Sequence, residues 1–206
     1  MKLFAPLLIA LGLSLTGSPA ARATEEPAWT LVYQDRDLEV RDYAPVVVAE
    51  TEVPGDRGAA INQGFRRLAR YIFGANAPRR AIAMTAPVTQ RESGQKIAMT
   101  APVSQTKGPA GWTIGFVMPK GSRLETMPAP VDANVVLREQ PGRRIAAIRF
   151  SGFATQSSLE RHRDEMMARL AQRQEKAIGT PSYAFYDPPW TPPWARRNEI
   201  IVEIAR

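Results

Sequence analysis

The chain of 206 residues carries 27 Lys and Arg against 20 Asp and Glu, for a formal net charge of +7 at pH 7, with one His and no Cys. Its hydrophobic fraction of 44% is ordinary for a folded globular protein, and its length suits one domain. The lack of Cys excludes disulfides, thiolate nucleophiles, thiolate zinc sites and iron–sulfur clusters, and a single His excludes every metal motif that needs two.

The first 23 residues have the three regions of a secretory signal peptide. Lys2 supplies the positive charge, residues 3–15 form the apolar stretch, and Ala21-Arg22-Ala23 is an A-x-A cleavage site. This stretch is shorter than the roughly 20 apolar residues of a membrane-spanning helix, and no later segment is long enough. We therefore expect cleavage of 1–23, and an exported, periplasmic protein of one domain, 24–206, that does not span a membrane.

Hydrophobic periodicity predicts that the rest of the chain consists of two similar halves. In the first half, alternating apolar residues predict strands, and the spacing of Ile61, Phe65 and Leu68 predicts a helix that Gly74 ends. The predicted elements are strands at 38–43 and 46–53, a helix at 56–74, strands at 82–88 and 97–103, and a following strand at 112–118.

The second half repeats this order, with a capping-box pattern of Ser157 and Glu160 at the start of its helix. Its predicted elements are strands at 135–139 and 144–150, a helix at 158–176, and strands at 182–186 and 199–204. Because each half has one helix to cover its strands, the halves are expected to share a sheet. The predicted fold class is α+β, a distorted antiparallel β-barrel of two pseudo-symmetric β-β-α-β-β halves with two long helices.

A heptapeptide occurs twice, because Ile-Ala-Met-Thr-Ala-Pro-Val stands at 82–88 and again at 97–103. Proline donates no ladder hydrogen bond, so Pro87 and Pro102 mark a strand end or an edge. We expect the two copies to be neighbouring strands. Two interpretations stay open: a hairpin in the core, or an apolar pocket lined by Met and Ala, since methionine adapts to irregular ligand surfaces.

The basic residues stand in short pairs such as Arg66-Arg67 and Arg143-Arg144, without the interleaved aromatic residues typical of nucleic-acid binding. We expect no nucleic-acid partner, and a small anionic ligand suits the net charge better.

The doubled Met-Thr-Ala-Pro-Val, together with motifs around it, resembles the SOUL haem-binding protein family. The further matching motifs, in chain order, are Phe73-Gly74-Ala75-Asn76, Phe116-Val117-Met118-Pro119, Tyr186-Asp187-Pro188-Pro189-Trp190-Thr191-Pro192-Pro193-Trp194 and Arg197-Asn198-Glu199. The resemblance extends from about Val32 to Ile204. It implies a distorted barrel of two halves, which agrees with the periodicity.

The resemblance also implies non-covalent, b-type binding of haem or another tetrapyrrole by an apolar surface, as carrier, buffer or sensor. The same architecture resembles bacterial effector-binding domains, which hold small ligands and do no chemistry. A small-ligand or protein interaction module without a physiological haem role is therefore the alternative.

In the family the first helix is associated with the porphyrin, and its counterpart here is 56–74. The apolar candidates are Ile61, Phe65, Leu68 and Ile72, and the candidate anchors for the haem propionates are Arg66 and Arg70. Tyr71 lies beside this face and can stack on a flat ring. The alternative is that the apolar residues seal the barrel and the arginines are solvated.

His162 borders the apolar side of the second predicted helix. It is a candidate axial ligand of haem iron, because neutral imidazole is a normal haem ligand. The alternative is a partly exposed surface histidine.

Two further features of the sequence bear on function. The acidic pairs Glu50/Glu52 and Asp164/Glu165 accompany no catalytic motif, so we expect no enzyme. The proline-rich stretch 188–194 either presents Trp190 and Trp194 to a partner or folds both indoles back on the barrel.

Overall fold

The structure is a computed structural model that describes residues 25–77 and 94–206. The expected signal peptide, 1–23, and the first heptapeptide copy, 82–88, lie outside the described residues. No helix in the described ranges is long and apolar enough to cross a membrane.

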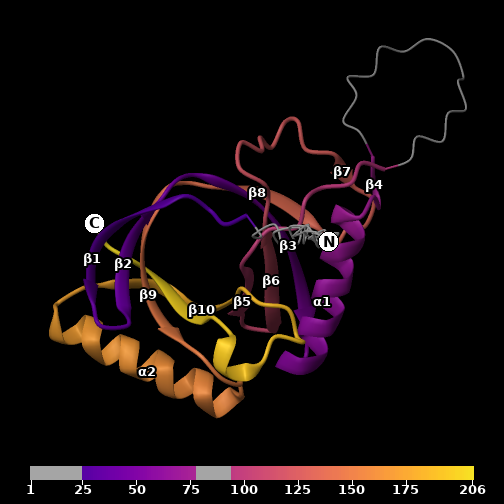
Figure 1. Ribbon diagram of the computed structural model, residues 1–206. Coiled ribbons are helices and arrows are strands. Elements are labelled where there is room, and N and C mark those ends of the chain that lie inside the picture. Colours follow the sequence, from indigo (N-terminus) through magenta and orange to yellow (C-terminus); the bar gives the residue numbers. More distant parts are fainter. Residues whose placement is uncertain (1–24, 78–93) are drawn as a thin grey trace, which may run out of the picture.

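Nine antiparallel strands form one sheet that curls into a half-barrel, and both helices lie on its outer side (Figure 1). The order along the sheet is β1-β2-β9-β11-β10-β5-β6-β3-β8. These strands are β1 (Trp29–Asp35), β2 (Leu38–Tyr43), β3 (Val46–Pro54), β5 (Val103–Lys107), β6 (Gly111–Val117), β8 (Val136–Gln140), β9 (Arg143–Phe150), β10 (Ala177–Phe185) and β11 (Asn198–Ile204). A short separate ladder pairs β4 (Asn76–Ala77) with β7 (Ala129–Pro130). The predicted fold class is confirmed.

The two halves exchange a strand. One half consists of β3, α1 (Arg57–Ile72), β5 and β6, and the other of β9, α2 (Gln156–Gln172), β10 and β11. They meet where β5 pairs with β10. β2 precedes the first half in the chain but pairs with β9, while β8 precedes the second half but pairs with β3. The halves therefore share one sheet, as the single helix of each requires.

α1 packs closely on β3 and β6. Its N-cap is Asp56, whose side chain accepts a hydrogen bond from the amide of Ala59 at 3.0 Å. Gly64 marks the closest approach, because a Cβ added there would lie 2.4 Å from Cγ1 of Ile114. This glycine thus costs helix propensity but lets the helix backbone lie against the sheet.

α2 begins earlier than predicted, and the predicted capping box is wrong. Thr155, not Ser157, is the N-cap, and its hydroxyl accepts from the amide of Ser158 at 3.2 Å. Glu160 instead accepts from the side chain of Gln156 at 2.6 Å, so it does not reach back to the cap. The helix also ends at Gln172 instead of residue 176, because Gln174 adopts a left-handed backbone conformation with φ 59° and the amide of Glu175 donates to the carbonyl of Leu170 at 2.9 Å.

The second heptapeptide copy, 97–103, is not the predicted strand. Its amides are bonded to other parts of the chain: Ile97 donates to the carbonyl of Ile72 at 2.7 Å, and Ala101 donates to that of Glu25 at 2.9 Å. Met99 is exposed, and the paired strand β5 begins at the end of this run.

Candidate functional site

The outer side of α1 presents a row of apolar residues one turn apart. Ile61, Phe65, Ala69 and Phe73 follow at intervals of four, and exposure rises to 38% at Phe65 and 59% at Phe73. The Phe65 ring meets Phe116 of β6 edge to face, with 5.4 Å between ring centroids. The row is therefore an exposed apolar surface with an aromatic ring held in place behind it.

Two arginines, Arg66 and Arg70, flank this row and are exposed. Within residues 25–77 and 94–206, the side chain of neither makes a hydrogen bond or ion pair. Arg67 differs, since its Nε lies 3.9 Å from Oδ2 of Asp132 and its Nη1 donates to the carbonyl of Glu52. The row thus lies beside two guanidinium groups that form no ion pair in this part of the chain, although the charge of Arg70 helps to lower the pKa of the Asp132 carboxyl.

Three residues predicted at the ligand face lie elsewhere. Leu68 and Ile72 are buried in the core, and Tyr71 is buried with its hydroxyl donating to the carbonyl of Pro128 at 2.9 Å. The physical reason is the helical period of 3.6 residues. Leu68 and Ile72, seven and eleven residues after Ile61, come back to the side of the helix that faces the core. Each step of four residues instead turns the row further round the helix, away from the core. The sequence interpretation missed that Phe73 completes the exposed row.

His162 lies on α2, which packs on β9, β10 and β11, away from the strands that carry α1 (Figure 1). Its ring stacks on Phe150 with 4.0 Å between centroids, and its Nδ1 lies 2.7 Å from the carbonyl oxygen of Ser158. A carbonyl only accepts, so in the neutral ring Nδ1 carries the proton and Nε2 is the nitrogen with a free lone pair. The structure does not bring His162 together with the arginines of α1.

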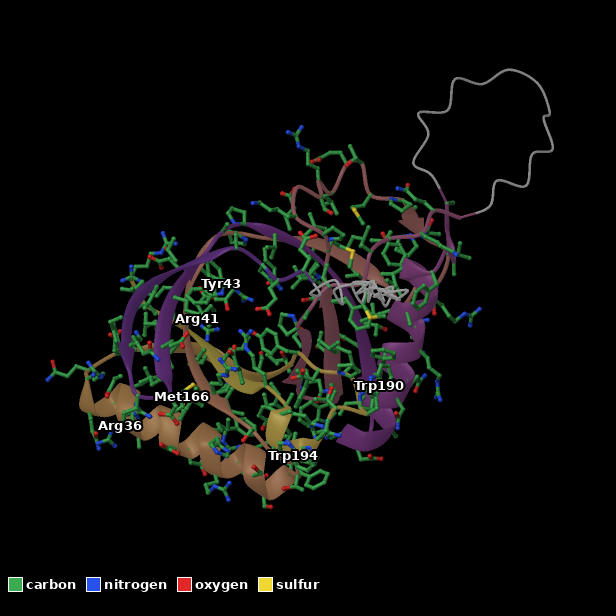
Figure 2. The ribbon with its side chains drawn as sticks, in the orientation of Figure 1. Arg36, Arg41, Tyr43, Met166, Trp190 and Trp194 are labelled. Carbon is green, nitrogen blue, oxygen red and sulfur yellow. The ribbon has the colours of Figure 1, made fainter. Side chains whose placement is uncertain are left out.

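The inner face of the half-barrel holds a buried ion pair between Arg41 of β2 and Glu199 of β11. The guanidinium donates to both carboxylate oxygens, at 2.8 and 2.9 Å, and the side chains are 2% and 0% exposed. The Glu199 carboxylate also accepts from Nε of Arg197 at 3.0 Å and from the Tyr186 hydroxyl at 2.7 Å. Figure 2 shows Arg41 and Tyr43 on the inner side of the curled strands.

This network fixes the charges of its members. Burial alone would raise the pKa of the Glu199 carboxyl, but the hydrogen bonds and charges of Arg41 and Arg197 outweigh burial and lower it. Burial and the neighbouring Glu199 charge raise the pKa of Tyr186, so its hydroxyl keeps its proton. Because the two partners are 158 residues apart, no local pattern in the sequence predicts them.

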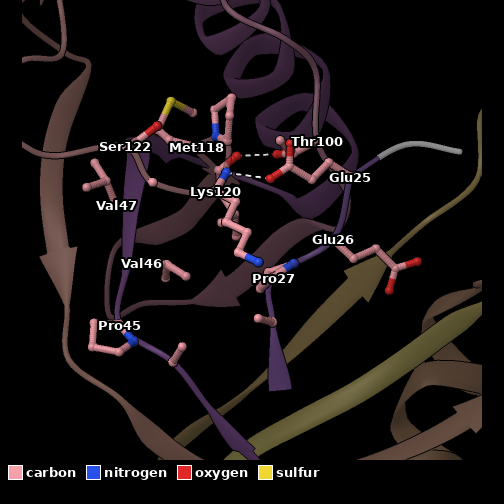
Figure 3. Close-up of a pocket in the computed structure, with 15 residues that line it drawn as sticks. Glu25, Glu26, Pro27, Pro45, Val46, Val47, Thr100, Met118, Lys120 and Ser122 are labelled. Carbon is pink, nitrogen blue, oxygen red and sulfur yellow. Dashed lines mark hydrogen bonds between the residues drawn. The ribbon is translucent and has the colours of Figure 1, made fainter. Parts of the chain in front are cut away.

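Two cavities border the inner face. One of about 230 Å³ lies between the start of the described chain and the β3 and β6 ends, lined among others by Glu25, Val46, Met118 and Lys120 (Figure 3). The other, of about 130 Å³, has hydroxyl and amide groups of Tyr43, Ser104, Thr106 and Gln140 on its walls. Sites for drug-sized ligands span roughly 300–1,000 Å³, so neither cavity holds a whole porphyrin.

Of the four acidic residues considered from the sequence, Glu50, Asp164 and Glu165 belong to ion pairs. Glu50 lies 3.6 Å from Arg138, Asp164 2.8 Å from Arg163, and Glu165 3.6 Å from Arg169. No group of three or more His, Asp and Glu side chains that could hold a metal ion exists in the described part of the chain.

Comparison with known proteins gives a family match over nearly the whole chain. The family described as SOUL heme-binding protein matches residues 24–203. The human protein named heme-binding protein 2 is 29% identical over 157 residues, which are 72% of this chain and 69% of that protein. The mouse protein named heme-binding protein 1 is 28% identical over 173 residues, which are 82% of each chain.

Solved structures share the fold at low sequence identity. The crystal structure of the EcmrR C-terminal domain has a TM-score of 0.57 and 11% identity, covering 85% of this chain and 99% of that one. A structure described as a hydrolase from Listeria innocua has a TM-score of 0.52 and 10% identity, covering 84% and 94% of the two chains. At such identities the likeness concerns the fold alone.

Proposed function

The chain belongs to the SOUL heme-binding protein family, and from this premise we propose that it binds haem or a related tetrapyrrole reversibly, without a covalent bond, on the outer face of α1. The observation that carries the proposal is the exposed row Ile61–Phe65–Ala69–Phe73 beside Arg66 and Arg70. One human and one mouse relative are named as heme-binding proteins, which supports haem or a related tetrapyrrole as the ligand.

The residues on this face suit the two chemical parts of haem. The flat macrocycle is apolar and stacks on aromatic rings, and Phe65 and Phe73 supply such rings. The two propionates are anionic, and the guanidinium groups of Arg66 and Arg70 match carboxylate geometry. Covalent attachment through thioethers is impossible, because the chain has no Cys.

The upper bound on binding free energy for a ligand of this size leaves room for micromolar affinity without an axial ligand. At about −0.3 kcal/mol for each non-hydrogen atom, a ligand of about 40 such atoms gains up to about −12 kcal/mol. Micromolar affinity needs only about −8 kcal/mol. Binding on α1 therefore requires no axial ligand, and His162 contributes little, since it lies on the other helix. Ligation by Nε2 of His162 would define a different site, on α2.

We further propose that the protein binds and releases haem as a carrier, buffer or sensor and does not transform it. The support is the exposed, unenclosed surface, which lets the ligand exchange, and the pairing of three of the four acidic candidates in ion pairs. A module that binds another small ligand, without a physiological haem role, is the alternative.

Titration of the mature protein with haemin, followed at the Soret band, tests the site. Phe65→Asp and Phe73→Asp place an unpaired carboxylate on the apolar row, and we expect each to weaken binding about tenfold or more. Arg66→Glu combined with Arg70→Glu is expected to weaken binding in a salt-sensitive way, because it repels the propionates.

A matched control is Met167→Asp on α2, because Met167 is 37% exposed, close to the 38% of Phe65. This variant should bind haemin like the wild type, and His162→Ala should weaken binding at most modestly. Abolition by His162→Ala with unchanged binding by the α1 variants would place the site on α2. If the wild type shows no saturable binding of haemin, the protein is better explained as a module that binds another small ligand. If the porphyrin band is lost when a reductant is added, the protein degrades haem and is an enzyme.

A further inference from the structure

The loop between β10 and β11, residues 186–197, holds both tryptophans of the proline-rich stretch in solvent. Trp190 is 83% exposed and Trp194 is 79% exposed, so of the two interpretations of this stretch the one in which the indoles fold back on the barrel is wrong (Figure 2). Phe153, in the segment just before α2, is also largely exposed. The amide of Gly152 donates to the carbonyl of Pro193 at 2.8 Å, which joins this segment to the loop. We call Phe153, Trp190 and Trp194 the aromatic patch.

The aromatic patch stands on a rigid frame. Arg196 donates to the carbonyl of Thr191 at 2.8 Å and to that of Pro189 at 2.6 Å, and its guanidinium lies 5.6 Å from the centroid of the Phe153 ring. The amide of Arg197 donates to the Asp187 carboxylate at 2.6 Å. These bonds order the backbone that carries the two indoles, so the cost of ordering the loop is not incurred again on binding.

The backbone of the loop has few free donors. Four of its twelve residues are prolines, which have no N–H: Pro188, Pro189, Pro192 and Pro193. Further amides are already bonded inside the loop, namely those of Tyr186, Thr191, Ala195, Arg196 and Arg197. Moving a backbone N–H group from water into an apolar layer costs free energy when the group has no hydrogen-bond acceptor there. Because this loop has few such N–H groups, its transfer costs little on this account.

The loop carries two arginines, Arg196 and Arg197, against one carboxylate, Asp187, so its formal charge is +1. Arg196 bonds to carbonyl groups and makes no ion pair with a carboxylate in the described part of the chain. The full sequence carries +7, and without Lys2 and Arg22 of the expected signal peptide the mature chain carries +5. An anionic surface is the complementary partner.

We propose that the aromatic patch docks the protein on the surface of an anionic phospholipid bilayer. Tryptophan prefers the interface between headgroups and acyl chains, where its ring lies in an apolar layer and its N–H reaches water. Basic residues next to such side chains meet lipid phosphates and are drawn to anionic leaflets. The patch consists of side chains that project from a loop, which suits insertion into a layer better than a grip on one peptide.

The test is partition of the mature protein onto vesicles of phosphatidylcholine and phosphatidylglycerol in equal parts, compared with phosphatidylcholine alone. We expect binding that is stronger on the anionic vesicles and weaker in high salt. Trp190→Ala combined with Trp194→Ala should lower the partition coefficient about tenfold or more, because two indoles lose their burial in the interface. Phe replacements at both positions should restore much of it.

The control is Phe73→Ala, which removes an exposed aromatic ring from the proposed haem face and should leave vesicle binding unchanged. Brominated phosphatidylcholine in the anionic vesicles should quench the tryptophan emission of the wild type, and the quenching should disappear in the double Ala variant. Equal partition of wild type and double variant overturns the proposal, as does absence of binding to either vesicle. Haemin titration of the double variant is expected to match the wild type, so failure here is distinguishable from failure of the haem site.

Discussion

Arg41→Met tests whether the buried pair on the inner face stabilises the fold. Removing one partner of a buried ion pair typically costs 3–5 kcal/mol, because the other charge stays in a low dielectric without its counter-ion. Here Glu199 would keep Arg197 at 3.0 Å and the Tyr186 hydroxyl at 2.7 Å, so we expect the lower end, about 3 kcal/mol. For a domain of this size that loss lowers Tm by roughly 6–12 °C.

The assay is urea unfolding of the mature protein, with Arg144→Met as a matched control on the neighbouring strand. Arg144 makes a similar two-bond pair with Asp42, at 3.0 and 2.8 Å, but the side chains are about one-third exposed. A pair in such contact with water is worth at most about 1 kcal/mol.

A double-mutant cycle with Glu199→Gln isolates the interaction. In Glu199→Gln, Arg41 still has Glu39 at 2.7 Å. The free-energy losses of the two single variants should therefore not add in the double variant, and we expect a coupling energy of about 1–3 kcal/mol between Arg41 and Glu199. The reasoning is refuted if Arg41→Met and Arg144→Met cost the same, or if the coupling is zero.

Three more outcomes are expected. Because the pKa of Glu199 is lower in the folded protein than in the unfolded chain, the unfolded chain takes up this proton first as the pH falls. The contribution of Glu199 to stability is therefore complete above the ordinary carboxyl pKa and is lost as the pH falls through the pKa of the folded protein. Urea midpoints measured between about pH 7 and 3 should fall less steeply for Glu199→Gln than for the wild type. Gly64→Ala should cost about 1–3 kcal/mol by thermal unfolding, because its Cβ would overlap Ile114, whereas a gain from helix propensity would contradict the close packing. N-terminal sequencing of protein exported from cells should begin at Thr24, and retention of residues 3–15 would disprove the signal peptide.

The sequence predicted those elements whose burial pattern is regular. β9 and α1 bury one side of a clear period, and both were predicted nearly to their ends. β5 was missed because Ser104 and Thr106 face the polar inner side while Gln105, on the core side, is held by Arg57 at 2.9 Å, so the strand has no apolar alternation. β1 was missed because it is an edge strand and mostly exposed.

The candidate site was predicted less well, for reasons of geometry. Periodicity identifies the helix but cannot separate its buried stripe from the exposed row beside it, which is why Leu68 and Phe65 were grouped although the first is buried and the second exposed. The exposure of Trp190 and Trp194 depends on hydrogen bonds of Arg196 within the loop, and composition does not encode these.

The two proposed surfaces are linked through α1. Arg57, at the first residue of this helix, contacts the segment that carries Phe153, and the apolar row then follows α1 to Phe73 just after its end. At 1.5 Å for each residue, the row ends roughly 25 Å along the helix from Arg57. Free haem is amphipathic, with an apolar ring and anionic propionates, so it partitions into the same interface that favours tryptophan. Docking through the loop would therefore hold the proposed haem face close to haem dissolved in the membrane. Haem would then pass between the bilayer and α1 without a long path through water.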